Sequence, residues 1–288
     1  MKVCAIVLNY FGHEETIACI NRLTSQPLAK IVALENSGSE DEKQILATAF
    51  TETPIVEIIS SKKNLGFAGG VNYALKQTIP DKFDAFLIMN NDTLPPSDLI
   101  EKLIKGTESF SLDLASPVIY NHPEQEKLWS KGNYYNIWTG LLTARPNSLL
   151  PGDFFYLTGC CLLIRTKVFE TMGLFDKDFF MYGEDMEFCF RAVQNGFKTG
   201  IVPDAKIYHK TGSSAVHNSF FYEHHINRSH FLLGNKLCLS FKACLFSQGL
   251  KTVLLAMRAI LRTLRYKNLN ALKGYLHARR EVPFIPKL

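Results

Sequence analysis

The sequence predicts an α/β protein with a mostly parallel sheet and a helical C-terminal extension. Short apolar runs alternate with helix-compatible stretches over the first hundred residues. These runs show no polar alternation, which is typical of strands that are buried on both faces. From about Asn227 to about Arg280 the pattern is helical, and Pro283 and Pro286 end it. A strand–helix alternation of this kind favours a sheet whose ligands collect at the carboxyl ends of its strands.

The first part of the chain accounts for four of the expected strands. They cover residues 3–8, 30–35, 55–60 and 84–90. A polar helical stretch follows the first strand to about Ser25, and a second helix is expected over 42–50. The glycine-rich segment 64–72 is expected to lead into a third helix. Its glycines suit a loop laid against a nucleotide or its phosphates, and the alternative is a tight strand–helix turn.

The middle third is less regular. Strands are expected at 114–120, 154–165 and 198–209, and the aromatic-rich stretch 128–147 is expected to form loops or a hairpin. A helix is expected over 184–196, because acidic residues occupy its first turn and Gly196 stands at its end. The start of the chain is expected to be the first strand rather than a signal peptide.

The charge is distributed unevenly along an otherwise ordinary globular composition. Apolar residues make up 47%, charged residues 20%, and the net charge is +5. Residues 226–288 hold twelve Lys or Arg and one acid, a charge of +11, which leaves −6 for residues 1–225. We therefore expect a catalytic domain over 1–225 and a basic amphipathic tail over 226–288 that meets an anionic surface.

The seven cysteines form no CxxC pair, and several lie in apolar runs. We expect them to be reduced core residues in a reducing cytosol, rather than disulfide or metal partners.

Polar residues stand where the expected strands end. They are Asn9, Glu35, Asn36, Asn64, Asn90, Asn91 and Asp92. Each of them alone could serve a turn, because Asn and Asp favour turns. A parallel sheet, however, brings all these strand ends to one edge, which predicts a polar site there.

A metal site is one interpretation of this edge. The Asp92 carboxylate suits a hard divalent cation that in turn holds a diphosphate, and Asn90 could add a carbonyl oxygen. His209 ends a later strand and could be a further ligand, although a single histidine at a strand end can also be a structural or surface residue. The alternative for Asp92 is a turn before Pro95 and Pro96.

Acidic residues open the helix expected at 184–196. Glu184 and Asp185 follow an aromatic–glycine loop, where a carboxylate could take a proton from a hydroxyl nucleophile. The alternative is that these acids only stabilise the helix dipole. Glu187 and Arg191 are four residues apart and are expected to form a helix-surface pair.

Taken in order, these motifs resemble glycosyltransferase family 2, in particular its bacterial rhamnosyl- and galactofuranosyltransferase-like branch. The resemblance covers roughly residues 3–215 and rests on VLNY, LENS, NLGFAGGVN, MNNDT, LTGCCLLIR, FFMYGEDMEFCFR and IYH. It implies a GT-A fold, an inverting mechanism and a nucleoside-diphosphate sugar as donor. Two departures from the family pattern stand out: Asn90 at the first position of the DxD signature, and Glu35 in place of the more usual aspartate.

The resemblance also implies roles for individual residues. Asp185 would be the general base, with Glu184 beside it in the catalytic pair. Mg²⁺ or Mn²⁺ would be held by Asp92 and His209, with Asn90 next to them. The donor would be bound by Asn9, Glu35, Asn36, Asn64, Gly66 and Asn91.

The expected reaction is transfer of a hexose onto a glycan or a polyprenyl-diphosphate-linked acceptor in bacterial surface polysaccharide synthesis. Rhamnose from dTDP-rhamnose is the first expectation for the sugar, and another hexose from a UDP-sugar is the second. The protein is expected to be cytoplasmic and peripheral at the inner face of the membrane. The alternatives are a noncatalytic nucleotide-sugar-binding or scaffold protein, and a nucleotidyltransferase.

The stretch 245–266 has the pattern of an amphipathic helix. At about 100° per residue, Lys251, Arg258, Arg262 and Arg265 share a sector of roughly 60°, and apolar residues fill a broad opposite face. Charges at every turn or two argue against a transmembrane span. The helix is expected to bind anionic lipid, or else to pack on the domain or in a homodimer. Nucleic acid is not an expected partner, since the tail carries no nucleic-acid motif.

Overall fold

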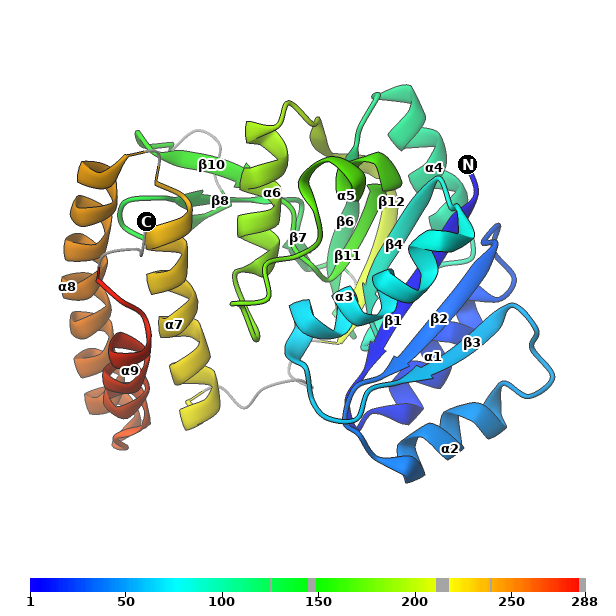
Figure 1. The fold of residues 1–288 in the computed structure, drawn as a ribbon, viewed down its shortest axis with the longest axis horizontal. Coiled ribbons are helices and arrows are strands. Elements are labelled where there is room, and N and C mark those ends of the chain that lie inside the picture. The colour runs from blue at the N-terminus through cyan, green and yellow to red at the C-terminus, as the bar shows by residue number, and fades with distance from the viewer. Residues whose placement is uncertain (125, 145–148, 211–217, 239, 285–288) are drawn as a thin grey trace.

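The computed structural model describes residues 1–124, 126–144, 149–210, 218–238 and 240–284. Within these residues the core is a nine-stranded mixed sheet with helices on both faces (Figure 1). In spatial order its strands are β3 (Val56–Ser60), β2 (Lys30–Glu35), β1 (Val3–Asn9), β4 (Ala85–Asn90), β11 (Cys161–Arg165), β6 (Leu114–His122), β12 (Thr199–Lys210) and β5 (Thr93–Leu94), with β7 (Leu128–Ser130) paired to β6.

The first four strands are parallel, as expected from their uninterrupted apolar runs. The chain then inserts β11 antiparallel between β4 and β6, so the sheet is mixed. The expected strand region 154–165 divides into two elements, because β10 (Asp153–Tyr156) belongs to a separate three-stranded sheet. The other two strands of that sheet, β8 (Asn133–Asn136) and β9 (Leu142–Thr143), form a hairpin within the stretch expected to be loops or a hairpin.

Two hydrophobic layers enclose the large sheet. One face packs against α1 (His13–Leu23) and α4 (Leu99–Ser109). The other face packs against α3 (Gly66–Thr78), α5 (Thr166–Met172) and α6 (Glu184–Gln194). The helix α2 (Glu40–Ala49) lies beside α1 at the β3 edge, and η1 (Ile79–Asp81) follows α3. The short α5 and the amphipathic α4 had no counterpart among the expected elements.

The C-terminal part forms three packed helices at one end of the molecule (Figure 1). They are α7 (Phe220–Lys236), α8 (Phe241–Tyr266) and α9 (Asn270–Glu281). The helix α7 begins before the expected boundary at residues 225 and 226 and runs through it. Phe231, Leu255 and Tyr275 join these helices to the core layer that holds α3 and α6.

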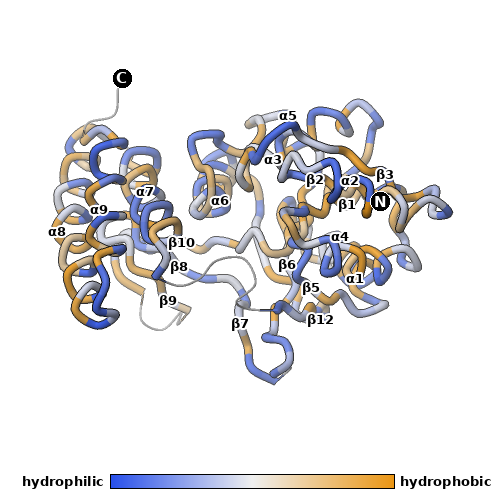
Figure 2. The backbone as a smooth tube through the Cα atoms, turned by 90° about the horizontal axis from the view of Figure 1, so that it is seen from below, coloured by the Kyte–Doolittle hydropathy of each residue, from blue (hydrophilic) through white to orange (hydrophobic). Residues whose placement is uncertain are grey.

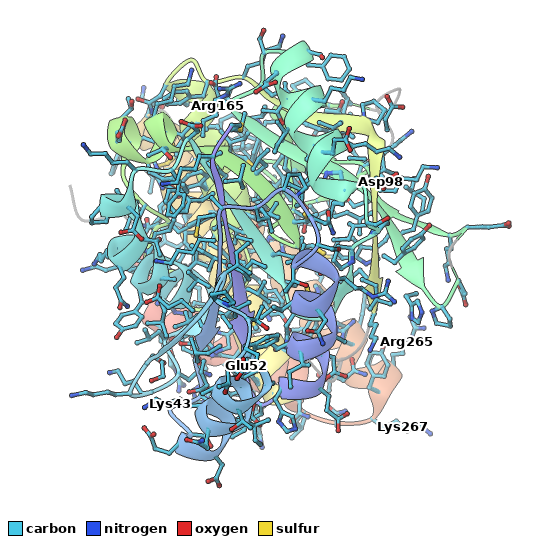
Figure 3. All side chains as sticks on the ribbon, turned by 90° about the vertical axis from the view of Figure 1, so that its right-hand side faces the viewer. Lys43, Glu52, Asp98, Arg165, Arg265 and Lys267 are labelled. Carbon is cyan, nitrogen blue, oxygen red and sulfur yellow. A yellow bond between two sulfur atoms is a disulfide. The ribbon has the colours of Figure 1, made fainter. Side chains whose placement is uncertain are left out.

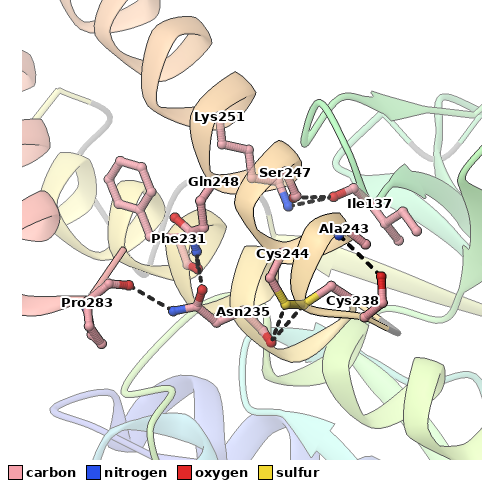
Figure 4. The surroundings of a disulfide bond; sticks show 11 residues. Ile137, Phe231, Asn235, Cys238, Ala243, Cys244, Ser247, Gln248, Lys251 and Pro283 are labelled. Atoms are coloured by element: carbon pink, nitrogen blue, oxygen red, sulfur yellow. Dashed lines mark hydrogen bonds between the residues drawn. A yellow bond between two sulfur atoms is a disulfide. The ribbon is translucent and has the colours of Figure 1, made fainter. Parts of the chain in front are cut away.

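The cysteine expectation is wrong for two of the seven residues. Cys238, just after α7, forms a disulfide with Cys244, near the start of α8 (Figure 4). Helix packing brings their Cα atoms within 5.3 Å, although a spacing of six residues is no recognisable disulfide signal. The other five cysteines are free and buried, as expected.

The cationic stripe of α8 faces the protein rather than an external anionic surface. The Lys251 ammonium group is fully buried and donates to the Ile137 carbonyl oxygen at 2.8 Å (Figure 4). Arg258 and Arg262 bind the buried Glu223 carboxylate of α7 at 2.8 and 2.6 Å. The predicted stripe is therefore present on the helix, but three of its four cations are used inside the fold.

Candidate functional site

The strand register brings the predicted polar residues to one edge of the sheet. Asn9 lies opposite Glu35, Glu35 lies opposite Ser60, and Leu8 lies opposite Asn90. Most polar side chains at this edge form hydrogen bonds with other residues of the same edge. These hydrogen bonds order the turns that follow the strands.

Asn9 orders the turn between β1 and α1. Its amide nitrogen donates to the Glu42 carboxylate at 2.9 Å, and its oxygen accepts from the Gly12 N–H and the Thr16 hydroxyl. Asn91 joins the same turn from the end of β4, since its amide donates to Thr16 at 3.0 Å. The ends of β1 and β4 are thus held together by side chains.

Glu35 orders the next turn. One carboxylate oxygen accepts from the backbone N–H and the hydroxyl of Ser37, and the other accepts from the Gly38 N–H at 3.1 Å. Asn36 connects this turn to α3. Its amide donates to the Gly66 carbonyl at 3.0 Å, and its oxygen accepts from the Leu65 N–H at 3.2 Å.

Gly66 is required by a close backbone approach. Its φ is +72°, and a Cβ at this position would lie 2.1 Å from the Phe180 carbonyl oxygen. That same oxygen accepts from the Phe67 N–H at 2.8 Å. Asn64 caps the turn, because its oxygen accepts from the Gly66 N–H at 2.8 Å. The glycine segment begins α3 instead of preceding it, and it fixes the loop that leads to Glu184 and Asp185.

The acidic pair lies at the start of α6. One Asp185 oxygen accepts from the Met186 N–H at 2.8 Å and the other from the Gly159 N–H at 3.0 Å. Burial raises the pKa of Asp185, and these hydrogen bonds oppose the rise. Burial, together with the neighbouring Asp185 charge, raises the pKa of Glu184 to about 8. The two adjacent carboxyl groups therefore differ in pKa because their environments differ, and Asp185 is the more readily ionised.

A second pair, Asp92 and His209, lies where β12 meets β5. The register places His209 opposite Thr93, and its Nε2 lies 3.1 Å from an Asp92 oxygen. Both side chains are largely buried, and the Trp129 ring packs on the imidazole with 4.8 Å between centroids. Across the parts of the chain that the structure describes, no group of three His, Cys, Asp or Glu side chains could hold a metal.

These two side chains fit a divalent cation only as a partial ligand set. A carboxylate oxygen and an imidazole nitrogen at hydrogen-bonding distance are suitable donor types for Mn²⁺ or Mg²⁺. Two protein ligands leave the remaining coordination positions of such a cation to other groups. At Asn90, the described contacts are those of the backbone, whose N–H donates to the Cys160 carbonyl at 3.0 Å.

The loop between β10 and β11 joins the two pairs. Gly159 donates to Asp185, and the next residue, Cys160, accepts from Asn90 at the end of β4. Two consecutive residues therefore connect the acidic start of α6 to the segment that carries Asp92. The sequence offered no metal-ligand or acid–base signal at these positions.

Aromatic side chains near the edge also escaped the sequence reasoning. Tyr10 and Phe11 directly follow Asn9, are more than half exposed and pack edge to face at 5.0 Å. Trp129 lies against His209 from the separate segment β7. Exposed aromatic rings beside strand ends could have been noticed for the first two, whereas Trp129 reaches the site through long-range folding.

The family model of glycosyl transferase family 2 matches residues 4–173. The chain is similar to the low-salt glycan biosynthesis hexosyltransferase Agl10 of Haloferax volcanii, with 26% identity over 81% of this chain and 75% of that protein. It is also similar to an N-acetylglucosaminyl-diphospho-decaprenol L-rhamnosyltransferase of Mycobacterium tuberculosis, with 24% identity over 74% of this chain and 77% of that one.

The fold resembles that of GalNAc-T7 in a crystal structure with UDP, GalNAc and Mn²⁺. The TM-score is 0.64 at 13% identity, and the match covers 96% of this chain and about half, 53%, of that one. The likeness confirms the GT-A fold, and the relatives confirm the resemblance to the rhamnosyltransferase-like branch. The family model covers more than half of the chain, which therefore belongs to glycosyltransferase family 2.

Proposed function

We propose that the protein is an inverting, metal-dependent glycosyltransferase that moves a hexose from a nucleoside diphosphate to a lipid-linked glycan acceptor. The observation that carries this proposal is the link between the two pairs. Gly159 holds Asp185, and Cys160 holds the end of β4 that leads to Asp92. Two consecutive residues thus connect the proposed acid–base group with the segment that carries the proposed cation site. This arrangement suits a reaction that deprotonates an attacking oxygen and stabilises charge on a departing one.

Asp92 and His209 would hold Mn²⁺ or Mg²⁺, which when bound neutralises charge on the departing nucleoside diphosphate. The Asp185 carboxylate takes the proton from the acceptor hydroxyl as its oxygen attacks the anomeric carbon from the side opposite the leaving diphosphate. One C–O bond forms as another breaks, so the configuration inverts. Glu184 stays protonated near neutral pH because its pKa is raised to about 8.

The polar edge is our proposed donor site. Glu35, Asn36 and Asn64 shape its turns, while Gly66 lets the loop at Phe180 approach. Asn9 and Asn91 support the site by ordering the turn before α1. The exposed Tyr10 and Phe11 rings at that turn offer flat apolar surface to a nucleoside base.

The names of the relatives support the finer assignment. Agl10 is a hexosyltransferase of glycan biosynthesis, and the mycobacterial relative is named for transfer of L-rhamnose to a diphosphodecaprenol-linked sugar. The solved neighbour GalNAc-T7 was crystallised with UDP and Mn²⁺. We therefore propose dTDP-rhamnose or a UDP-hexose as donor, and a polyprenyl-diphosphate-linked acceptor at the cytoplasmic face of the membrane.

The test is release of nucleoside diphosphate from a panel of UDP-, dTDP- and GDP-sugars by the purified protein. We expect one donor to be hydrolysed slowly with Mn²⁺ or Mg²⁺, and not in EDTA. Adding a polyprenyl-diphosphate-linked saccharide should accelerate turnover, and NMR of the product should reveal an inverted anomeric centre. A nucleotidyltransferase would instead release diphosphate from a nucleoside triphosphate, and a noncatalytic protein would bind a donor without turnover.

A matched pair of variants tests the metal site. Asp92→Asn removes the proposed carboxylate ligand and should reduce turnover by roughly 100-fold, with partial recovery at high Mn²⁺. Asp98→Asn is the control, because Asp98 is an exposed residue paired with Lys102 on the surface of α4. Full activity of the wild-type protein in EDTA would remove the metal from the proposal.

A further inference from the structure

The helix α8 presents its apolar side to solvent. Six side chains on this side, between 53% and 70% exposed, form what we term the α8 apolar face: Phe246, Val253, Met257, Ile260, Leu261 and Leu264. They span nineteen residues, from Phe246 to Leu264, which is about 27 Å along a helix axis. Figure 2 shows α8 along the outer side of the C-terminal helices, with α7 and α9 between it and the catalytic part.

The inward side of α8 explains this orientation. Arg258 and Arg262 form ion pairs with Glu223, the buried acid of α7. Lys251 is held by the Ile137 carbonyl, so the cationic sector cannot turn outward without breaking three buried contacts. The apolar residues, opposite on the helical wheel, must then face away from the protein.

An exposed apolar face of this length is unusual on a soluble monomer. Among the described residues, α8 is the one helix that is long and apolar enough to cross a membrane by length and composition. Its attachment to α7 through buried ion pairs favours a helix that lies along a surface over one that spans a bilayer, because a spanning helix would carry those cations with it.

The charges around the face indicate which surface covers it. Arg265 and Lys267 are exposed at the C-terminal end of α8 (Figure 3), and Lys242 is exposed at its start. The helix contains no Asp or Glu. A second copy docked about a two-fold axis would bring these cations together with no acid on α8 to pair them. An anionic bilayer complements both the exposed cations and the apolar face, because its headgroups carry negative charge and its acyl chains form an apolar layer beneath them.

A second element contacts the start of the α8 apolar face. The Trp138 ring packs edge to face on Phe246 at 5.8 Å, which ties the three-stranded sheet to the start of α8. Four more exposed leucines, Leu141, Leu142, Leu149 and Leu150, stand in or next to the strands of that sheet in the sequence. In Figure 1, β8 and β10 lie between α6 and the C-terminal helices, and β10 contacts α6.

We propose that the α8 apolar face inserts into the interfacial layer of an anionic bilayer and holds the enzyme on it. The inference extends the proposed function, in which the acceptor is lipid-linked and therefore stays at the membrane. It differs from simple electrostatic adsorption, because apolar side chains rather than the cationic stripe supply most of the binding.

The test is flotation with vesicles of phosphatidylcholine and phosphatidylglycerol, compared with vesicles of pure phosphatidylcholine. Wild-type protein should bind both and bind the mixed vesicles more tightly, and high salt should remove only that difference. The double variant Leu261→Gln/Leu264→Gln should weaken binding to both by at least about tenfold, because two leucines, 64% and 70% exposed, lose their gain from burial in lipid.

Two controls separate this inference from folding and from the proposed function. Ile45→Gln/Val193→Gln changes two exposed apolar residues on α2 and α6 and should bind vesicles like wild type. Donor hydrolysis and thermal melting should be unchanged in both double variants. If the wild-type protein binds vesicles but hydrolyses no donor of the panel, the proposed function is overturned and the membrane inference stands.

A local probe tests the orientation of the helix. The chain's free cysteines are all buried, so a cysteine introduced by Met257→Cys can be labelled with a polarity-sensitive dye. With mixed vesicles the dye emission should shift to the blue and resist quenching by iodide, unlike the same dye introduced by Ile45→Cys. No vesicle binding by the wild type, or a dimer that Leu261→Gln/Leu264→Gln dissociates, would overturn the membrane inference.

Discussion

The proposed base can be tested by replacing Asp185 with asparagine. Asp185 uses both carboxylate oxygens to accept backbone N–H groups, from Met186 and Gly159. Asparagine offers one oxygen, so one of these N–H groups loses its acceptor, at a cost of about 1–2 kcal/mol in the free energy of unfolding. The variant should therefore fold, while turnover falls by roughly 100-fold or more from loss of the proton acceptor.

Glu184→Gln is the matched control. Its carboxyl has a pKa of about 8, so near neutral pH glutamine replaces a group that is mostly protonated. We expect turnover within about threefold of wild type. The acid limb of the pH–rate profile should also be kept, because Asp185 ionises first in the pair.

The assay is initial-rate transfer at saturating donor and Mn²⁺, with donor affinity by calorimetry and the free energy of unfolding from urea titration. Asp185→Asn should keep donor affinity within about threefold, because the change lies on the acceptor's proton path. Near-normal turnover by Asp185→Asn would refute the assignment. So would a greater loss of turnover in Glu184→Gln, which would make Glu184 the base.

Three further predictions concern stability and loop geometry. Glu223→Gln should lower the free energy of unfolding by about 3 kcal/mol in urea titration, because two arginines lose their charged partner. Gly66→Ala should lower both turnover and melting temperature, since its Cβ would meet a backbone oxygen at 2.1 Å, whereas Gly249→Ala, with open space around it, should raise the melting temperature slightly. The raised pKa of Glu184 means that the folded state binds more protons than the unfolded state between about 4.5 and about 8, so stability falls as pH rises through that window. Glu184→Gln should therefore melt higher than wild type at pH 8 but not at pH 4, and equal differences at both pH values would contradict this.

The sequence was most informative where structure is local. Each early strand is a short apolar run that ends in polar residues, so its position and the common edge follow from periodicity and parallel pairing. This reasoning predicted that Asn90, Asn91 and Asp92 lie at this edge, and β4 does end at Asn90. The pairing of Asp92 with His209 was predicted by resemblance, and the structure places them 3.1 Å apart, although their role as metal ligands remains a proposal.

The sequence was least informative where a side chain has a choice of partners. Asn9 and Glu35 were assigned to the donor, but their polar atoms also satisfy the turns that follow β1 and β2. Strand pairing over long separations was also invisible. Nothing in the run 154–165 indicated that its two halves join different sheets, because that division depends on which neighbours the folded chain supplies.

The orientation of α8 is an instance of the same ambiguity. A helical wheel establishes that cations and apolar residues occupy opposite sectors, but either sector can be the buried one. Burying arginine is costly unless a charged partner is buried with it, and a tail with one acid among twelve Lys or Arg argues for an outward stripe. Glu223 reverses that conclusion, because it lies just before the tail, on the helix against which α8 packs. One acid outside the tail thus decides that the cations stabilise the fold and that the apolar residues are available to lipid.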